Sequence, residues 1–590
     1  MVPKVWFSVL VLLLATPAFG QGGLGGQQRQ QQPPGGPGRG QGPMRAQPQR
    51  ADAPRGTAIM RGQIVAADNG SPIRRAQVRV TSPDAREGRI ATTDAQGRFE
   101  IKELPAGRYT ISASKGGFVS LQYGQRRPTE SGTPIELADG QTIEKLTIGL
   151  PRGSVLCGRV TDEFGEPVAN ASVTAWRYTY VAGARRLTPA GQNARDTTDD
   201  QGHYRLFGLP PGDYYVGATL RTVGPEVTDP MGEPSGYAMT YFPGTPNVSE
   251  AGRVTLAVSQ ENTTINFGLI ATKLVKVSGQ VLMSDGTPAN GMVMLMPSNA
   301  NGRPGIALQQ GGTGNRIDAN GSFRMSNVAP GRYVLQARAG GGFQPRGGGG
   351  GRNAELARME LTVGTDDVEG LTLVTAPGAT VNGNIISDTG EPFDFKPQQF
   401  QVAARPASPD ATMPGAGMAP ARVADDWSFS LGNLSDAVII RTNAPQGWTL
   451  KAVLLNGQDI TDTPMEFPPA QTIGGMQIVM SKKIASLSGL ITDGKGNPVL
   501  DATVIVFPAD ERLWTYQSRF IKAARPDQDG RYRISALPGA TSYLAVALQG
   551  LEDGQAGDPE FLATVKDVAT RLDLGEGETV AVDVKLSAPK

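Results

Sequence analysis

The sequence has few of the residues that build reactive sites and covalent cross-links. Its 590 residues include one cysteine, Cys157, and one histidine, His203. A single cysteine excludes an internal disulfide, so an exported chain of this length must take its stability from packed cores. A single histidine excludes a zinc site that needs two histidines and a glutamate. We expect Cys157 to be a small buried apolar residue and His203 to face solvent at the start of a strand.

Charge of one sign and long apolar runs are also missing. The 56 Lys and Arg residues nearly balance the 55 Asp and Glu residues, so no extended field favours nucleic acid as a partner. An apolar run, Val5 to Ala15, follows Lys4 and precedes Pro17 and Gly20, which is typical of a signal peptide over residues 1–20. No later run approaches the roughly 20 apolar residues of a membrane helix. We therefore expect an exported protein, periplasmic, cell-surface or extracellular, with no integral membrane segment after signal cleavage.

Glycine and proline, in contrast, are abundant. The 77 Gly and 45 Pro residues exclude a mainly helical protein, while 39% apolar residues are enough for packed cores. Residues 21–57 are rich in Gln, Gly, Pro and Arg and lack large apolar side chains, which predicts a disordered linker. The arginines of this linker leave contact with an anionic surface as an alternative to a solvated tether.

A first motif, Gly-x-Ile/Val followed by Gly-x-Pro, recurs five times. Glycine can take the positive φ of a hairpin turn and proline fixes φ beside it, so each copy predicts a strand, a turn and a second strand. The second strand alternates apolar and polar residues, which predicts one buried and one solvated face. The copies begin at Gly62, Gly158, Gly279, Gly383 and Gly489, and their turn glycines are Gly70, Gly165, Gly286, Gly390 and Gly496.

A second motif, Asp-x-x-Gly-x-aromatic, follows in four copies. Aspartate can bond the backbone of its own turn and glycine can take the left-handed position, so we interpret the motif as a tight turn before an inward-facing aromatic residue. A metal site is the alternative for these aspartates. The aspartates are Asp94, Asp199, Asp318 and Asp527.

A third motif is a loop, often Leu-Pro-x-Gly, that leads to a tyrosine at the start of another alternating strand. The tyrosine ring can pack inward while its hydroxyl is satisfied at the edge of the module. The tyrosines are Tyr109, Tyr214, Tyr333 and, in a looser copy, Tyr543. The fourth repeat departs from the pattern, because Trp427 stands where the turn glycine is expected and Leu434-Ser435-Asp436 replaces the proline loop.

The spacing of the repeats predicts an all-β protein of five tandem seven-stranded β-sandwiches, immunoglobulin-like or prealbumin-like. The first glycines are 96, 121, 104 and 106 residues apart, close to the roughly 100 residues of one sandwich. The predicted domains are module 1 (58–150), module 2 (151–271), module 3 (272–376), module 4 (377–481, divergent) and module 5 (482–590).

The order of these motifs resembles the carboxypeptidase regulatory-like domain, which has a transthyretin-like or prealbumin-like fold related to carbohydrate-binding domains. Residues 121–128 and 241–244 are similar to those of multi-module secreted bacterial members of the family. The resemblance covers residues 58–590 and is strongest in modules 1 and 2. It implies a fold rather than an activity.

The search for chemistry predicts no catalytic residue, no cofactor and no metal site. Paired carboxylates of the glycosidase kind cannot be singled out among 55 acidic residues. Some relatives of the family form an internal bond from lysine to Asn or Asp. Modules 1 and 2 lack the lysine for it, whereas Lys273, Lys276, Lys482 and Lys483 leave it open in modules 3 and 5.

The candidate binding residues are Trp176, Tyr178 and Tyr180 in module 2. Ala171, Val173 and Ala175 occupy the inward phase of the same strand, so an unbroken strand places the three aromatic residues on its outward face. Such a row could stack on sugar rings or anchor a protein. The alternative is a bulge that returns the rings to the core, or a neighbouring module that covers them.

These observations predict a non-catalytic exported binding and spacer protein of the cell envelope, with a glycan or a cell-envelope protein as its partner. The alternative is a protein-interaction scaffold, accessory to an outer-membrane receptor, that binds by strand addition at a sheet edge. An enzyme that hydrolyses an envelope polymer is the third hypothesis.

Overall fold

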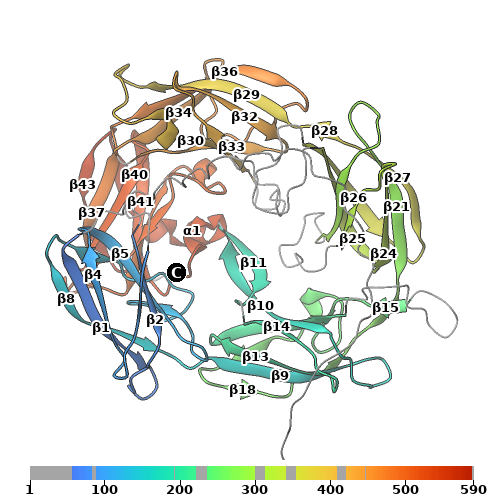
Figure 1. Ribbon diagram of the computed structural model, residues 1–590. Helices are drawn as coiled ribbons and strands as arrows, with labels where there is room; N and C mark the ends of the chain where they lie inside the picture. Colours follow the sequence, from blue (N-terminus) through green and yellow to red (C-terminus); the bar gives the residue numbers. More distant parts are fainter. Residues whose placement is uncertain are drawn as a thin grey trace, which may run out of the picture. The chain divides into compact units, whose positions relative to one another are not determined.

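The computed structural model describes residues 56–82, 88–181, 183–191, 193–220, 235–298, 313–340, 354–407, 420–445 and 447–587. They belong to one compact unit, residues 53–590. The predicted signal peptide and nearly all of the predicted linker lie outside the described residues. The fold is all-β, with small sheets that form tandem β-sandwich modules (Figure 1). Within the described ranges, no helix is both long and apolar enough to cross a membrane.

Module 1 has two sheets around one core. Its strands are β1 (Ala58–Ala66), β2 (Gln77–Thr81), β3 (Arg89–Thr92), β4 (Arg98–Leu104), β5 (Gly107–Ser114), β6 (Leu121–Gln122), β7 (Ile135–Leu137) and β8 (Thr142–Leu150). In the first sheet, β1 lies between antiparallel β4 and parallel β8. In the second, β2 lies between β3 and β5, and both β6 and β7 pair with β5. Module 1 therefore has eight strands rather than the predicted seven, because the edge strand beside β5 is split into β6 and β7.

Module 2 repeats this plan. Its elements are β9 (Ser154–Thr161), β10 (Ser172–Val181), β11 (Ala184–Pro189), β12 (Arg195–Thr197), β13 (His203–Leu209), β14 (Gly212–Thr219), β15 (Ser235–Tyr237), β16 (Thr240–Tyr241), η1 (Val248–Glu250), β17 (Val254–Leu256), β18 (Glu261–Asn262), β19 (Phe267–Gly268) and β20 (Ala271–Lys273). β9 pairs with antiparallel β13 and with two parallel pieces, β18 and β19. β10 pairs with β14 up to Trp176, and from Arg177 onward it pairs with β11 alone.

Module 3 keeps the same central arrangement. Its strands are β21 (Val275–Leu282), β22 (Gly291–Pro297), β23 (Thr313–Arg316), β24 (Ser322–Val328), β25 (Gly331–Ala339), β26 (Glu355–Val363), β27 (Val368–Val374) and β28 (Ala376–Pro377). β21 lies between antiparallel β24 and parallel β27, and the second sheet has the order β23-β22-β25-β26-β28.

Module 4 diverges in its strand pairing. Its elements are β29 (Ala379–Ser387), η3 (Pro397–Gln399), β30 (Gln401–Pro406), β31 (Ala421–Arg422), β32 (Ser428–Leu434), β33 (Val438–Asn443), β34 (Thr449–Leu455), β35 (Gln458–Asp459) and β36 (Thr472–Ser481). β34 pairs with β36 instead of β33, so the first sheet grows to five strands and the second keeps three.

Module 5 carries the helical insertion. Its elements are β37 (Ala485–Thr492), β38 (Ala502–Pro508), η5 (Glu511–Leu513), β39 (Lys522–Ala524), β40 (Arg531–Leu537), β41 (Thr541–Gln549), η6 (Gln555–Gly557), α1 (Pro559–Val565), η7 (Lys566–Val568), β42 (Thr570–Leu574), β43 (Thr579–Ala581) and β44 (Val584–Lys585). Leu562 and Val565 of α1 pack in a cluster with Phe507 of β38 and Leu548 of β41, separate from the cluster inside the sandwich. β38 is therefore buried at every position, on both of its faces.

The cores follow the predicted alternation. The apolar residues after each tyrosine of the third motif are buried: Ile111, Ala113, Val216, Ala218, Leu335, Ala337, Ala545 and Ala547. Each belongs to a cluster whose members come from one module only. Full burial of a valine, leucine or isoleucine side chain contributes about 1.5–3 kcal/mol, so these clusters explain why the apolar positions recur.

The turn interpretation of the second motif is confirmed. The Oδ1 of Asp94 accepts hydrogen bonds from the backbone N–H groups of Gln96 and Arg98, both at 2.8 Å, and Gly97 has a φ of +72°. The Asp527 carboxylate accepts the equivalent pair of bonds in module 5. These oxygens are therefore used to hold their own turns.

The tyrosines of the third motif also behave as predicted. The Tyr109 hydroxyl donates to the carbonyl oxygen of Pro105 at 2.8 Å, four residues earlier. Tyr333 donates in the same way to Ala329 at 2.7 Å. Each ring is thus packed inward while its hydroxyl fixes the loop that precedes the strand.

Candidate functional site

The predicted aromatic row lies on β10, but its three members differ in accessibility. Trp176 is only 2% exposed, and its Nε1 has no hydrogen-bond partner within the described part of the chain. On the same face of the sheet, Met239 and Tyr241 lie 2.9 Å from where a Cβ on Gly217 would be. The expectation of an exposed Trp176 ring is therefore wrong, because the chain after β14 folds back over this face.

Tyr178 and Tyr180 follow Trp176 along β10, and Tyr180 packs against module 5, where a Cβ on Gly554 would lie 3.3 Å from the Tyr180 Cβ. Both are partly exposed. The Tyr178 ring meets the Tyr215 ring edge-on, with 5.7 Å between centroids, and the Arg185 guanidinium lies 4.6 Å from its centroid. Burial, with Asp558 as a smaller cause, raises the pKa of Tyr180, so its hydroxyl stays protonated and can donate a hydrogen bond.

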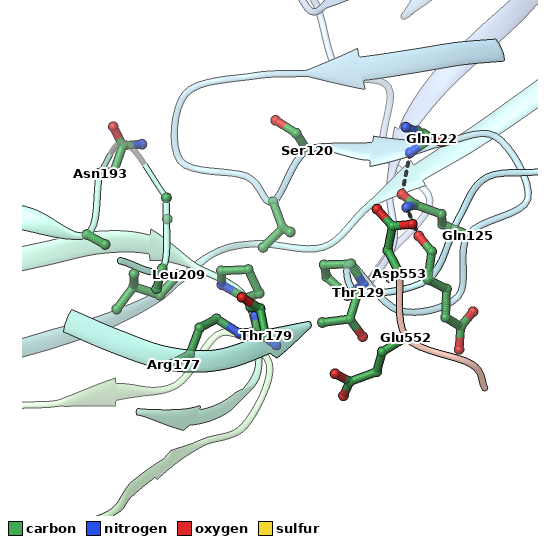
Figure 2. A pocket seen from close by; sticks show the side chains of 18 of the residues that line it. Ser120, Gln122, Gln125, Thr129, Arg177, Thr179, Asn193, Leu209, Glu552 and Asp553 are labelled. Carbon is green, nitrogen blue, oxygen red and sulfur yellow. Dashed lines mark hydrogen bonds between the residues drawn. The ribbon is translucent and has the colours of Figure 1, made fainter. Parts of the chain in front are cut away.

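The candidate site is a cavity of about 730 Å³ lined by modules 1, 2 and 5. Figure 2 shows labelled side chains from all three modules around it. Module 2 supplies Arg177 and Thr179, the residues that alternate with the aromatic row along β10, together with Tyr180 at its end. The cavity thus uses mainly the opposite face of the strand that the sequence singled out.

The remaining wall comes from loops and the ends of short strands, and it is mostly polar. Its other side chains with hydrogen-bonding groups are Ser120, Gln122, Gln125, Thr129, Glu130 and Ser131 from module 1, Asn193 from module 2, and Glu552 and Asp553 from module 5. Phe118 and Leu209 add apolar surface. The wall therefore combines hydroxyl, amide and carboxylate groups with a few rings and aliphatic side chains.

Internal hydrogen bonds shape the module 1 side of the cavity. The Gln125 side-chain oxygen accepts from the Gln122 backbone N–H, and its Nε2 donates to the Glu130 carbonyl oxygen. The Gln122 Oε1 accepts from the Gly132 N–H at 2.9 Å. These bonds hold the loop between β6 and β7 in place, so this wall is formed before any ligand arrives.

Arg177 supplies a cationic group to the wall. Its guanidinium lies 5.9 Å from the centroid of the Tyr214 ring. Burial raises the pKa of Tyr214 to about 12, and the positive charge of Arg177 opposes that shift. A guanidinium held beside a ring presents its N–H donors in a fixed plane.

A second, more open hollow of about 960 Å³ contains both Cys157 and His203. Cys157 is partly exposed, not buried as predicted, because β9 turns it toward the outer face of its sheet. Burial, followed by the nearby Glu261, raises the pKa of the thiol, which disfavours the reactive thiolate. His203 is on the surface as predicted, with its Nδ1 3.8 Å from the Asp199 carboxylate.

No group of three or more His, Cys, Asp or Glu side chains is placed to hold a metal ion within the part of the chain that the structure describes. One of the lysines left open for an internal bond, Lys482, forms an ion pair with Asp394 of module 4, with 2.9 Å between Nζ and Oδ2.

Comparison with known proteins agrees with the all-β modules described above. Residues 59–151 and 155–269 match the model of the carboxypeptidase regulatory-like domain, and the chain carries these domains in tandem. The matched ranges are modules 1 and 2, where the motifs are most regular, and the match confirms the predicted resemblance.

Individual relatives are distant. Colossin-A of Dictyostelium discoideum is 21% identical over 308 residues, which are 46% of this chain and 2% of Colossin-A, so the chain spans a very small part of that protein. A streptococcal ancillary pilin is 18% identical, with coverage of 54% of this chain and 98% of the pilin and a TM-score of 0.20. The major pilin subunit of Bacillus cereus is 11% identical, with coverage of 54% and 99% and a TM-score of 0.13.

Proposed function

We propose that this is an exported, non-catalytic binding and spacer protein of the cell envelope, and that its ligand is a carbohydrate held in the cavity of modules 1, 2 and 5. The observation that carries the proposal is the mixture of groups on the cavity wall, which Asn193, Ser120, Arg177 and Tyr180 all line. Its volume of about 730 Å³ falls in the usual range of ligand pockets, about 300–1,000 Å³.

Sugar chemistry fits these groups. Each sugar hydroxyl donates one hydrogen bond and accepts up to two, so amide and hydroxyl side chains can satisfy it in either direction. The C–H faces of a pyranose ring pack on aromatic and aliphatic surface. Tyr180 adds an aromatic residue to the wall at the end of β10.

The non-catalytic part of the proposal is supported by the position of the single histidine. His203 is 55% exposed beside Asp199 and is not among the residues that line the cavity. The matched domain family is a regulatory-like one. The role as a spacer is supported by the tandem modules, and export by the charge, apolar run and small residues at 1–20.

The test is a glycan array with the mature chain, followed by affinity measurements with the best-retained glycan. Arg177→Ala and Asn193→Ala should each weaken binding at least about tenfold, equivalent to about 1.4 kcal/mol. Tyr178→Ala is the matched control, because Tyr178 lies on the same strand outside the cavity wall.

The outcomes separate two places for the ligand. Unchanged affinity in both cavity variants, with loss in Tyr178→Ala, would move the ligand to the outer face of β10 and sink the cavity proposal. Retention of no glycan by the folded wild-type chain would sink the carbohydrate proposal itself.

A further inference from the structure

One segment of module 1, residues 129–136, is bound by module 5 through its main chain. The backbone N–H of Asp553 donates to the Thr129 carbonyl oxygen at 2.6 Å. The Nη1 of Arg525 donates to the Ser131 carbonyl oxygen, also at 2.6 Å. Neither bond depends on which side chain module 1 carries at that position.

The third contact takes the place of strand pairing. The Gln528 amide accepts from the Glu136 N–H at 3.1 Å and donates to the Glu136 carbonyl oxygen at 3.3 Å. Glu136 is the central residue of β7, which pairs with β5. In an antiparallel pair alternate residues turn both groups away from the neighbour, and at an edge these are the groups that another chain would bind. In this chain the side-chain amide of Gln528 binds both outward groups of Glu136.

Arg525 limits the strength of this contact. Its side chain is 4% exposed, and its Nε and Nη2 have no hydrogen-bond partner among the described residues. The nearest carboxylate, Glu130, lies 3.9 Å away, beyond hydrogen-bond distance. Burial of an incompletely paired cation opposes association, so the contact is weaker than its hydrogen bonds alone would make it.

The two surfaces are different and far apart in the sequence. Glu136 and Gln528 are separated by 392 positions, with modules 2, 3 and 4 between them. A contact between two different surfaces can pass from one molecule to the next without any change in its bonds, and it then links molecules head to tail. We propose that module 5 of this chain binds residues 129–136 of a second copy, in exchange for its own.

Within one chain the internal contact is favoured, because modules 2, 3 and 4 link the two surfaces covalently and keep them at a high effective concentration. The exchange should therefore become visible when the internal contact is broken in two complementary ways. The proposal does not depend on the ligand of the cavity.

The experiment mixes two full-length variants. Arg126→Asp/Glu136→Pro turns the 2.7 Å ion pair between Arg126 and Asp501 of module 5 into a repulsion and removes the outward N–H of β7. An edge strand tolerates proline where its N–H faces away from the sheet. Arg525→Ala/Gln528→Ala removes the two side chains of module 5 that hydrogen-bond the backbone of residues 131 and 136. Each variant alone should sediment as a monomer, whereas the mixture should form a one-to-one complex of twice the mass.

Glu136→Ala is the matched control. It keeps both backbone groups, so its internal contact persists and its mixture with Arg525→Ala/Gln528→Ala should stay monomeric. A mixture of the two double variants that stays monomeric, with circular dichroism like the wild type, would overturn the proposal. If Arg126→Asp/Glu136→Pro does not fold, Arg126→Asp alone replaces it, because it keeps the repulsion from Asp501 of module 5.

Discussion

The hydroxyl of Tyr204 donates a hydrogen bond to the carbonyl oxygen of Ile265 at 2.8 Å. Ile265 lies between β18 and β19, where the last strand of the sheet is interrupted. Module 5 repeats the relationship, with Tyr532 and the Val582 carbonyl oxygen 2.6 Å apart at the break between β43 and β44. The modules with an unbroken last strand have phenylalanine there: Phe99, Phe323 and Phe429. The tyrosine hydroxyl thus donates a hydrogen bond to a backbone carbonyl oxygen at the break in the strand.

Tyr204→Phe should destabilise module 2 by about 1–3 kcal/mol, because it leaves the buried Ile265 carbonyl without that donor. Amide hydrogen exchange resolved by peptide should show the loss in module 2 alone. Tyr237→Phe is the control, since its hydroxyl donates to the exposed Glu163 carboxylate and its loss should cost less than about 0.5 kcal/mol. Equal effects of the two variants would contradict this account.

Gly158→Ala should be far more harmful than Gly165→Ala. A Cβ on Gly158 would lie 1.8 Å from the Ile265 carbonyl oxygen, so the strands must separate, at a cost of at least about 3 kcal/mol. Gly165 has open space around it but a φ of +82°, so alanine there costs about 1–2 kcal/mol of backbone strain. Thermal unfolding of the two variants checks the order, and the reverse order would refute the close-approach argument.

Trp427→Gly should be more stable than Trp427→Ala. Trp427 has a φ of +65° at the position where modules 1, 2, 3 and 5 have glycine, and its ring contacts the Phe393 ring at a tilt of 41°, with 4.2 Å between centroids. Both variants lose the ring, but only alanine retains the strain of the left-handed conformation, about 1–2 kcal/mol. Urea unfolding measures the difference, and equal stability would show that no strain is present.

Stability should fall at alkaline pH through the buried tyrosines. Burial raises the pKa of Tyr214 and of Tyr333 to about 12, above the ordinary value of about 10. Because the folded state holds the proton more tightly, this contribution is complete below about pH 10 and is lost as the pH rises through about 12. Urea unfolding across this range should show the decline, and Tyr333→Phe should make it shallower. A decline that starts well below pH 10 would count against these two tyrosines as its cause.

Much of the fold could be predicted because its signals are local. The glycine of Gly-x-Pro, the Asp94 turn and the inward tyrosines each act within a few residues, and all were confirmed. Two features were not predicted: β34 joins the first sheet of module 4 instead of the second, and α1 covers the outer face of β38. Both depend on which surfaces meet after the strands have formed. The count of five modules stays a prediction.

The candidate site was less predictable. Alternation along β10 places Tyr178, whose ring meets Tyr215, on the other face from Arg177, whose guanidinium lies beside the Tyr214 ring. It could not tell that the chain near Tyr241 would cover the face of Trp176, or that the opposite face would line a cavity. Glu552 and Asp553 have no local sequence signal, because they reach the cavity only through the contact with module 1.

By itself, the sequence determined the kind of module, since hydrogen bonds over a few residues and the period-two burial of apolar side chains need no knowledge of distant parts. Only the tertiary structure decided which strand face stays open and which backbone groups of β7 meet Gln528. Those choices depend on contacts between residues far apart in the sequence, up to 392 positions for Glu136 and Gln528, where pairing is fixed by geometry rather than by neighbouring residue types.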